Sequence, residues 1–228
     1  MRLEFKKRLN HTVIMIICPA QPFDIFSIMN IERQSFIPAI QEKKRVFERR
    51  LRLFPEGFLV LADCDDELVL KNKVALVCGY LCSEKWDSEE FAAAAKDERL
   101  LRKRFALNHN ISHTHKTGGS VLYVSSLALL KEYRGKGLGE RFFVNSVAAL
   151  CASLGGIKKI VLLVNSEWEN ALRIYRKLGF TEDFVLKGFF PTIQKKVNSD
   201  GIIMSADSEI FRKIEFAGSE NDLSGIRI

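Results

Sequence analysis

The stretch from residue 121 to residue 143 constrains the fold of this chain most. Its first ten residues, Val-Leu-Tyr-Val-Ser-Ser-Leu-Ala-Leu-Leu, are apolar and β-favouring and predict a strand, whereas apolar residues recur at helical spacing from Leu138 onward. Between the two lies a glycine-rich turn, Arg134-Gly135-Lys136-Gly137-Leu138-Gly139. Free backbone N–H groups and the positive end of a helix dipole, beside Arg134 and Lys136, predict a site for a pyrophosphate.

The glycine spacing excludes two common phosphate loops. A nucleotide P-loop places a hydroxyl residue after its lysine, but Lys136 lies between two glycines. A dinucleotide-binding turn needs a third glycine where this chain has Glu140. The spacing Arg-x-x-Gly-x-Gly, formed by Arg134, Gly137 and Gly139, instead resembles the acetyl-CoA pyrophosphate loop of the GNAT acetyltransferase superfamily.

A second stretch, Ile160 to Phe180, resembles the other GNAT signature, a strand followed by a short helix. In that signature an alanine precedes a tyrosine by four residues and the helix closes on Gly-Phe. The matching residues here are Ala171, Tyr175, Gly179 and Phe180. Because both stretches occur in the family's order and at about its spacing, the chain is identified as a member of the GNAT superfamily. The nearest resemblance is to ribosomal-protein alanine and arylalkylamine acetyltransferases.

The resemblance implies one mixed α/β (α+β) domain with a central, mostly antiparallel sheet of about seven strands flanked by helices. At 228 residues and 47% hydrophobic residues, the chain is long enough for one such core. We expect residues 1–14 to be an N-terminal extension, 15–205 the acetyltransferase domain and 206–228 a C-terminal tail. A helical insertion is predicted near 87–107, either as a flap over the substrate or as a plain surface helix.

Composition favours a cytoplasmic protein without a metal or a membrane span. The five cysteines lack Cys-x-x-Cys spacing and histidine partners, which indicates reduced thiols. The apolar run at 13–18 is about six residues, too short for a signal peptide, and nothing approaches the ~18 apolar residues of a membrane span. His109, His113 and His115 are expected in a mobile polar loop.

The net charge of +7 and pI near 9.2 raise the possibility of nucleic-acid binding. The positive residues are spread along the chain without interleaved aromatic residues, which favours solvated helix faces instead. We therefore expect no nucleic-acid partner. A ligand with several phosphates, such as CoA, could still use a few of these side chains.

The family resemblance also implies a reaction, the direct transfer of an acetyl group from acetyl-CoA to an amine. The main chain of Leu127, Ala128 and Leu129 is then expected to pair with the pantetheine arm, and one N–H of that strand to face the thioester oxygen. Tyr175 is the expected general acid, with a core aromatic residue as the alternative. The predicted cofactor contacts are Leu127, Ala128, Leu129, Arg134, Gly135, Lys136, Gly137, Leu138, Gly139 and Asn170.

The general base is harder to assign, because positions where relatives carry a glutamate or histidines hold Leu163, Tyr123 and Ser125 here. Glu32 is our candidate, with Glu56 or a water chain past Tyr123 and Ser125 as alternatives.

The acceptor is expected to be a primary amine, either of a small molecule or of a protein N-terminus, and the protein a monomer or homodimer. Phe189-Phe190-Pro191 resembles the Tyr-Tyr-Pro of N-terminal alanine acetyltransferases, but both hydroxyls are missing. The competing hypothesis is a non-catalytic acyl-CoA-binding module.

Overall fold

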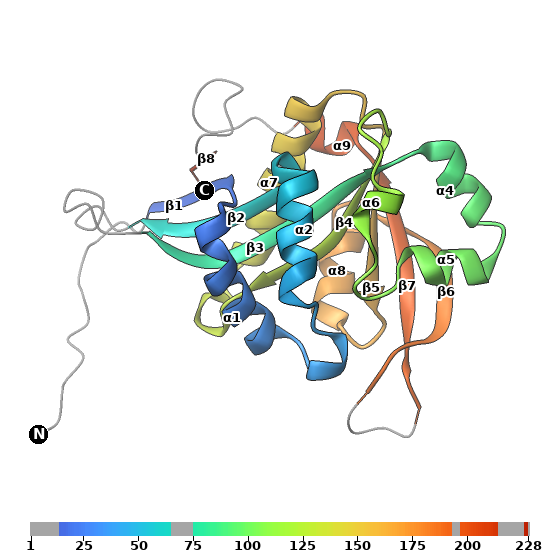
Figure 1. Ribbon diagram of the computed structural model, residues 1–228, viewed down its shortest axis with the longest axis horizontal. Helices are drawn as coiled ribbons and strands as arrows, with labels where there is room; N and C mark the ends of the chain where they lie inside the picture. Colours follow the sequence, from blue (N-terminus) through green and yellow to red (C-terminus); the bar gives the residue numbers. More distant parts are fainter. Residues whose placement is uncertain (1–13, 65–74, 193–196, 214–225, 228) are drawn as a thin grey trace, which may run out of the picture.

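A computed structural model describes residues 14–64, 75–192, 197–213 and 226–227, and its centre is one twisted sheet (Figure 1). The strands run in the order β6-β7-β5-β4-β3-β2-β1-β8. All neighbours are antiparallel except β4 and β5. The predicted mostly antiparallel sheet is confirmed, and a two-residue β8 extends it. The strands are β1 (Ile14–Pro19), β2 (Phe58–Cys64), β3 (Leu76–Trp86), β4 (Val121–Leu129), β5 (Lys159–Asn165), β6 (Thr181–Phe190), β7 (Ser199–Asp207) and β8 (Ile226–Arg227).

The two parallel strands separate halfway along their length. β4 pairs with β5 only over Val121–Val124, and then continues to Leu129 paired with β3 alone. The amide of Leu130 donates to the carbonyl of Cys78 on the β3 side. The N–H and C=O groups of successive strand residues point alternately to the two sides of the strand. Those of Leu127 and Leu129 therefore point away from β3, toward the gap before β5. The sheet therefore contains an open strand edge in its middle.

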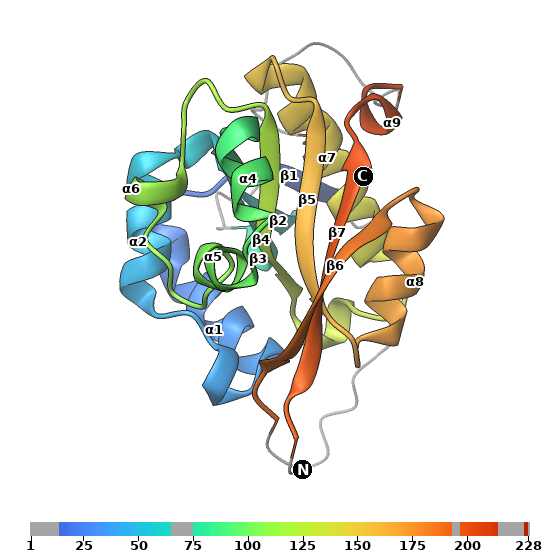
Figure 2. The ribbon, with the colours of Figure 1, turned by 90° about the vertical axis from the view of Figure 1, so that its right-hand side faces the viewer.

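Helices cover both faces of this sheet (Figure 2). On one face lie α1 (Ile25–Ser35) and α2 (Lys44–Leu53), and on the other lie α7 (Leu138–Leu154) and α8 (Glu169–Lys177). The apolar side of α7 packs into the core through Phe142, Phe143 and Val147. Short elements join these layers: η1 (Pro22–Asp24), η2 (Pro38–Ile40), η3 (Pro55–Gly57), η4 (Lys131–Tyr133), α6 (Ile111–Thr114) and α9 (Glu209–Arg212).

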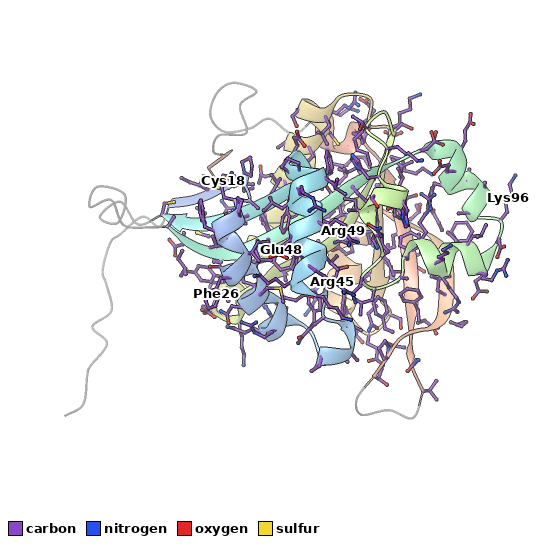
Figure 3. All side chains as sticks on the ribbon, viewed as in Figure 1. Cys18, Phe26, Arg45, Glu48, Arg49 and Lys96 are labelled. Atoms are coloured by element: carbon purple, nitrogen blue, oxygen red, sulfur yellow. The ribbon has the colours of Figure 1, made fainter. Side chains whose placement is uncertain are left out.

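The outer side of α2 carries much of the positive charge. Figure 3 shows Arg45, Glu48 and Arg49 on the side of α2 that faces away from the sheet, while Val46 and Phe47 are buried beneath it. The solvated helix face expected from the sequence is thus present. Arg50, which follows in the same basic run, is an exception because it is buried.

The insertion predicted near 87–107 forms two helices, α4 (Ser88–Ala94) and α5 (Glu98–Arg104). Asp87 and Asp97 cap them, each accepting hydrogen bonds from two backbone amides of the first turn. Beneath them lies a separate apolar cluster in which Trp86 stacks on Tyr123 with ring centroids 4.2 Å apart. The insertion therefore packs on the sheet over the end of β3 and the start of β4, and it is not a detached surface helix.

The packed core continues past residue 205. Phe211 of α9 is fully buried, with its ring 6.1 Å from both Phe143 and Phe180. The expected N-terminal extension, the tip of the β2–β3 hairpin and the lysine pair at 195–196 fall wholly or mostly outside the described residues. Across the described ranges, no helix is both long and apolar enough to cross a membrane.

Candidate active site

A cleft of about 910 Å³ opens where β4 and β5 separate. Its walls come from α1, α2, α5, β4, β5, the start of α8 and the end of β6. Seven of the predicted site residues line it, namely Glu32, Leu127, Ala128, Leu129, Arg134, Asn170 and Tyr175. The remaining five, Gly135 to Gly139, form the loop that follows Arg134 and leads into α7. The structure thus brings the two predicted groups of residues to one place.

The glycine loop has the backbone form that its sequence predicts. Gly135 and Gly137 have φ angles of 79° and 74°, in the left-handed region that favours glycine, and α7 begins immediately afterwards at Leu138. A Cβ atom at either glycine would meet nothing within 4 Å, so the space above the loop is open. The first amides of the 17-residue α7 have no partner within the helix and point toward this space. The loop therefore fits a pyrophosphate.

Two other predicted cofactor contacts are already engaged in hydrogen bonds. The guanidinium of Arg134 donates to the carbonyl of Leu129, and the side-chain oxygen of Asn170 accepts from Arg173 at 2.9 Å. Lys136 is exposed beside the glycines. Both Arg134 and Lys136 are exposed, and Arg134 is the one whose guanidinium also donates hydrogen bonds to the protein.

Tyr175 lies on α8 with its ring packed edge-on against Phe143 at 5.2 Å. Burial raises the pKa of its phenol to about 12, so the hydroxyl stays protonated at neutral pH. Within the described part of the chain this hydroxyl has no hydrogen-bond partner, although the residue lines the cleft. Complete proton transfer to a thiolate with a pKa of about 8.5 would be uphill by about 5 kcal/mol, which favours hydrogen-bond donation to the sulfur.

Glu32 is buried at 1% exposure, and both of its carboxylate oxygens accept hydrogen bonds. Oε1 accepts from the amide of Glu42 at 2.7 Å, and Oε2 accepts from the hydroxyl of Tyr80. Burial raises the pKa of this carboxyl to about 7, although the hydrogen bond from Tyr80 acts in the opposite direction. Glu32 therefore changes protonation state near neutral pH, as a general base must.

A buried ion pair joins α2 to the cleft, and sequence reasoning did not identify it. Arg50 is 2% exposed and its Nη2 donates to Glu42 Oε1 at 3.0 Å, while its Nη1 donates to Ser125 Oγ at 2.6 Å. Burial disfavours the charge on Arg50, but Glu42, Cys82, Glu84 and Tyr123 together outweigh it and raise the pKa of the guanidinium. Ser125 is the extra residue of a β-bulge opposite Cys82 and Ser83. The pair thus supports β4 where it leaves β5.

A second buried pair contradicts the expectation of a mobile loop at His109. Its Nε2 lies 2.5 Å from Glu84 Oε1 and its Nδ1 lies 3.2 Å from the carbonyl of Ala106. These two contacts hold the His109 ring between β3 and the loop that precedes α6. His115 instead accepts from the amide of Lys85, and the described residues contain no group of three or more ligands that could hold a metal. A glutamate inside the apolar strand β3, Glu84, was the feature of the sequence that could have indicated a buried partner for His109.

Aromatic side chains form the wall of the cleft opposite β4. Trp168 lies between Phe36 and Phe190, with ring centroids 5.7 Å from each. These three residues come from the end of α1, the start of α8 and the end of β6. Phe105 of the insertion and Phe189 extend the same wall. An acceptor with an apolar body would be accommodated here.

Comparison with known proteins supports the family predicted from the sequence. The model of the acetyltransferase (GNAT) family matches residues 25–180. The chain therefore belongs to the acetyltransferase (GNAT) family, and it is an enzyme of the acyltransferase class. No match was found among curated proteins.

Three solved structures illustrate the shared fold. The loading GNATL domain of CurA from Lyngbya majuscula superposes with a TM-score of 0.65 at 17% identity, covering 86% of this chain and 98% of that one. The ribosomal-protein-S18-alanine N-acetyltransferase from Escherichia coli has a TM-score of 0.55 at 16% identity, covering 85% and 93%. Arabidopsis thaliana NAA60 in complex with acetyl-CoA gives 0.58 at 16% identity, covering 85% and 98%.

Proposed function

We propose that this protein transfers the acetyl group of acetyl-CoA to a primary amine, of a small molecule or of a protein N-terminus, by direct attack. One observation carries the proposal. The open edge of β4, Tyr175, the buried Glu32 and Arg134 at the start of the glycine loop all line one cleft. Acetyl-CoA, when bound, supplies an activated acyl group on a thiol leaving group.

The residues divide the work of the reaction among them. Amides at Gly135 to Gly139 hold the pyrophosphate, and the peptide groups of Leu127 and Leu129 hold the pantetheine arm and face the thioester oxygen. Tyr175, neutral at physiological pH, donates a hydrogen bond to the departing sulfur. Glu32, with a pKa of about 7, takes the proton that an alkyl ammonium must lose before it can attack.

The nature of the acceptor follows from the walls of the cleft. The aromatic residues Phe36, Trp168 and Phe190 favour an amine attached to an apolar group. Both an apolar small-molecule amine and a peptide with an apolar first residue satisfy this chemistry. Cytoplasmic location and a monomeric or homodimeric state belong to the same proposal.

Calorimetric titration with acetyl-CoA tests the cofactor site. Gly137→Glu places a side chain and a negative charge in the loop, and we expect it to weaken binding by about 100-fold or more. Gly156→Glu is a matched control, because Gly156 has a φ of 66°, has open space around it and lies just beyond the far end of α7. Equal binding by wild type and Gly137→Glu would contradict the assignment.

Turnover separates the enzyme from a non-catalytic acyl-CoA-binding module. Release of CoA thiol is followed with a panel that contains alkyl amines, arylalkyl amines and short peptides with free N-termini. We expect thiol release above background hydrolysis with at least one apolar amine. Tight binding of acetyl-CoA without such release by any acceptor would favour the binding module.

A further inference from the structure

Glu32 lines the cleft, but an amine there meets very little of its surface. The residue is 1% exposed, and its two oxygens already accept from the amide of Glu42 and from the hydroxyl of Tyr80. Each oxygen keeps a lone pair, but its burial restricts direct contact with an acceptor amine. An intermediary with more of its surface in the cleft would let Glu32 act as the base.

Tyr80 and Ser126 form a continuous path between Glu32 and the cleft. Tyr80 lies on β3, is fully buried and does not line the cleft. Its hydroxyl contacts both Glu32 Oε2 and Ser126 Oγ, the second at 2.9 Å. Ser126 lies on β4, is only half-buried and lines the cleft next to Leu127. The path therefore begins beside the peptide group assigned to the thioester oxygen.

The direction of the hydrogen bonds follows from the number of protons. An ionised Glu32 only accepts, so the single proton of the Tyr80 hydroxyl points to Glu32. Ser126 must then donate to Tyr80, because the Tyr80 oxygen has no second proton to offer. The lone pairs of Ser126 Oγ remain for a donor in the cleft. The chain of donors is thus aligned from the cleft inward to Glu32.

We propose that Ser126 and Tyr80 relay the proton of the acceptor amine to Glu32, an inference that rests on the proposed acetyl transfer. The ammonium gives its proton to Ser126 Oγ, the Ser126 proton passes to Tyr80 Oη, and the Tyr80 proton passes to Glu32 Oε2. Both hydroxyls end with one proton each, Glu32 becomes a carboxylic acid, and the amine is left neutral. After the product has left, the proton passes outward from Glu32 through Tyr80 and Ser126 to water in the cleft, which returns the relay to its starting state.

The surrounding charges are consistent with this direction of transfer. Glu42 and Arg50 are the charged groups near Glu32, and Glu42 raises its pKa whereas Arg50 lowers it. Burial raises the pKa of the Tyr80 phenol well above its usual value, so a free phenolate is disfavoured. Tyr80 can therefore pass a proton on only as it receives another. Glu32, with a pKa of about 7, is the group in the path that holds the proton.

The test compares Tyr80→Phe with wild type in the thiol-release assay, using the best amine of the panel between pH 5.5 and 9. Tyr80→Phe keeps the ring but breaks the path, so we expect kcat/KM at pH 7 to fall by about 100-fold and the rise of the rate near pH 7 to disappear. Glu32→Gln should have the same effect, and the double variant should be no worse than either single one, because both changes interrupt one path.

Tyr133→Phe is the matched control, since Tyr133 also donates to a carboxylate, Asp63 Oδ2 at 2.7 Å, but does not line the cleft. It should keep the wild-type rate and pH profile. Acetyl-CoA binding measured by calorimetry confirms that each variant is folded. A wild-type pH profile in Tyr80→Phe, with active wild type, would overturn the relay alone. Absence of turnover by wild type with every amine would instead overturn the proposed acetyl transfer, and the relay with it.

Discussion

The guanidinium of Arg134 folds back along its own loop and donates two hydrogen bonds to the carbonyl oxygen of Leu129, from Nε at 2.8 Å and Nη2 at 2.6 Å. Nη2 also donates to Ser35 Oγ at 2.7 Å. Leu129 ends β4 and Ser35 ends α1, so one side chain ties the open strand edge to the start of the glycine loop and to α1. This contact gives Arg134 a positioning role as well as a charge.

Substitution of Arg134 distinguishes these two roles. Arg134→Lys keeps the charge but loses the planar fork that grips the Leu129 carbonyl. If positioning dominates, Arg134→Lys and Arg134→Ala should both lower acetyl-CoA affinity by about 10-fold, as expected when charge-assisted hydrogen bonds at an exposed site are lost. Calorimetry measures both affinities. Full recovery in the lysine variant would mean that Arg134 acts through its charge.

Local patterns in the sequence were sufficient to predict the strand, loop and helix around Gly137, and the helix that carries Tyr175. Those elements depend on apolar spacing and on glycine conformation, which can be read from neighbouring residues. The boundaries of elements are less well specified by such patterns, because α2 begins at Lys44 only after η2 and a short extended segment.

The contacts that complete the candidate site could not be predicted in the same way. Tyr80 and Glu32 are 48 residues apart, and Arg50 and Ser125 are 75 apart. The contact of Arg50 depends on the β-bulge at Ser125, and both pairs depend on how α1 and α2 lie on the sheet, which no local pattern specifies. For the same reason, the burial of Arg50 could not be predicted from its place among exposed basic residues of α2.

Removal of the Tyr175 hydroxyl tests its role as donor to the departing sulfur. Tyr175→Phe keeps the edge-on packing against Phe143, so the fold and acetyl-CoA affinity should change little. We expect kcat to fall by roughly 100-fold, the lower end of the range for general acid–base catalysis. Single-turnover thiol release with the acetyl-CoA affinity measured in parallel checks this. An unchanged rate would reduce Tyr175 to a packing residue.

The raised pKa of Glu32 also predicts a dependence of stability on pH. Because the folded-state pKa, about 7, lies above the unfolded value near 4.5, the contribution of Glu32 to stability is complete below pH 4.5 and is lost as pH rises through 7. Glu32→Gln carries no charge at any pH. We therefore expect the stability of wild type relative to this variant to fall by about 2 to 3 kcal/mol between pH 5 and pH 8.

Urea denaturation at several pH values measures this difference. Glu48→Gln is the control, because Glu48 is exposed on the outer side of α2 and its ion pair with Lys44 lies in solvent. The difference between wild type and Glu48→Gln should stay within about 0.5 kcal/mol over the same range. If the difference in stability between wild type and Glu32→Gln did not change with pH, Glu32 would have the same pKa in the folded and unfolded states. Its pKa would then no longer support a role as a base.

Two ion pairs that involve residues of α2 should differ sharply in their contribution to stability. Arg50 and Glu42 have side-chain exposures of 2% and 10%, whereas Lys44 and Glu48 have exposures of 66% and 51%. Arg50→Met leaves the Glu42 carboxylate buried without its partner, which should cost about 3 to 5 kcal/mol in the free energy of unfolding. Lys44→Met removes a solvated partner and should cost less than about 1 kcal/mol.

The double variant Arg50→Met/Glu42→Gln completes the comparison. Removing the stranded charge should recover part of the stability lost in Arg50→Met, because the main cost is an uncompensated buried carboxylate rather than the lost attraction. Urea denaturation at pH 7.5 gives the three free energies. A loss in Arg50→Met no greater than in Lys44→Met would indicate that water reaches Glu42, and that Arg50 does not support the β4 bulge at Ser125 as the 2.6 Å contact implies.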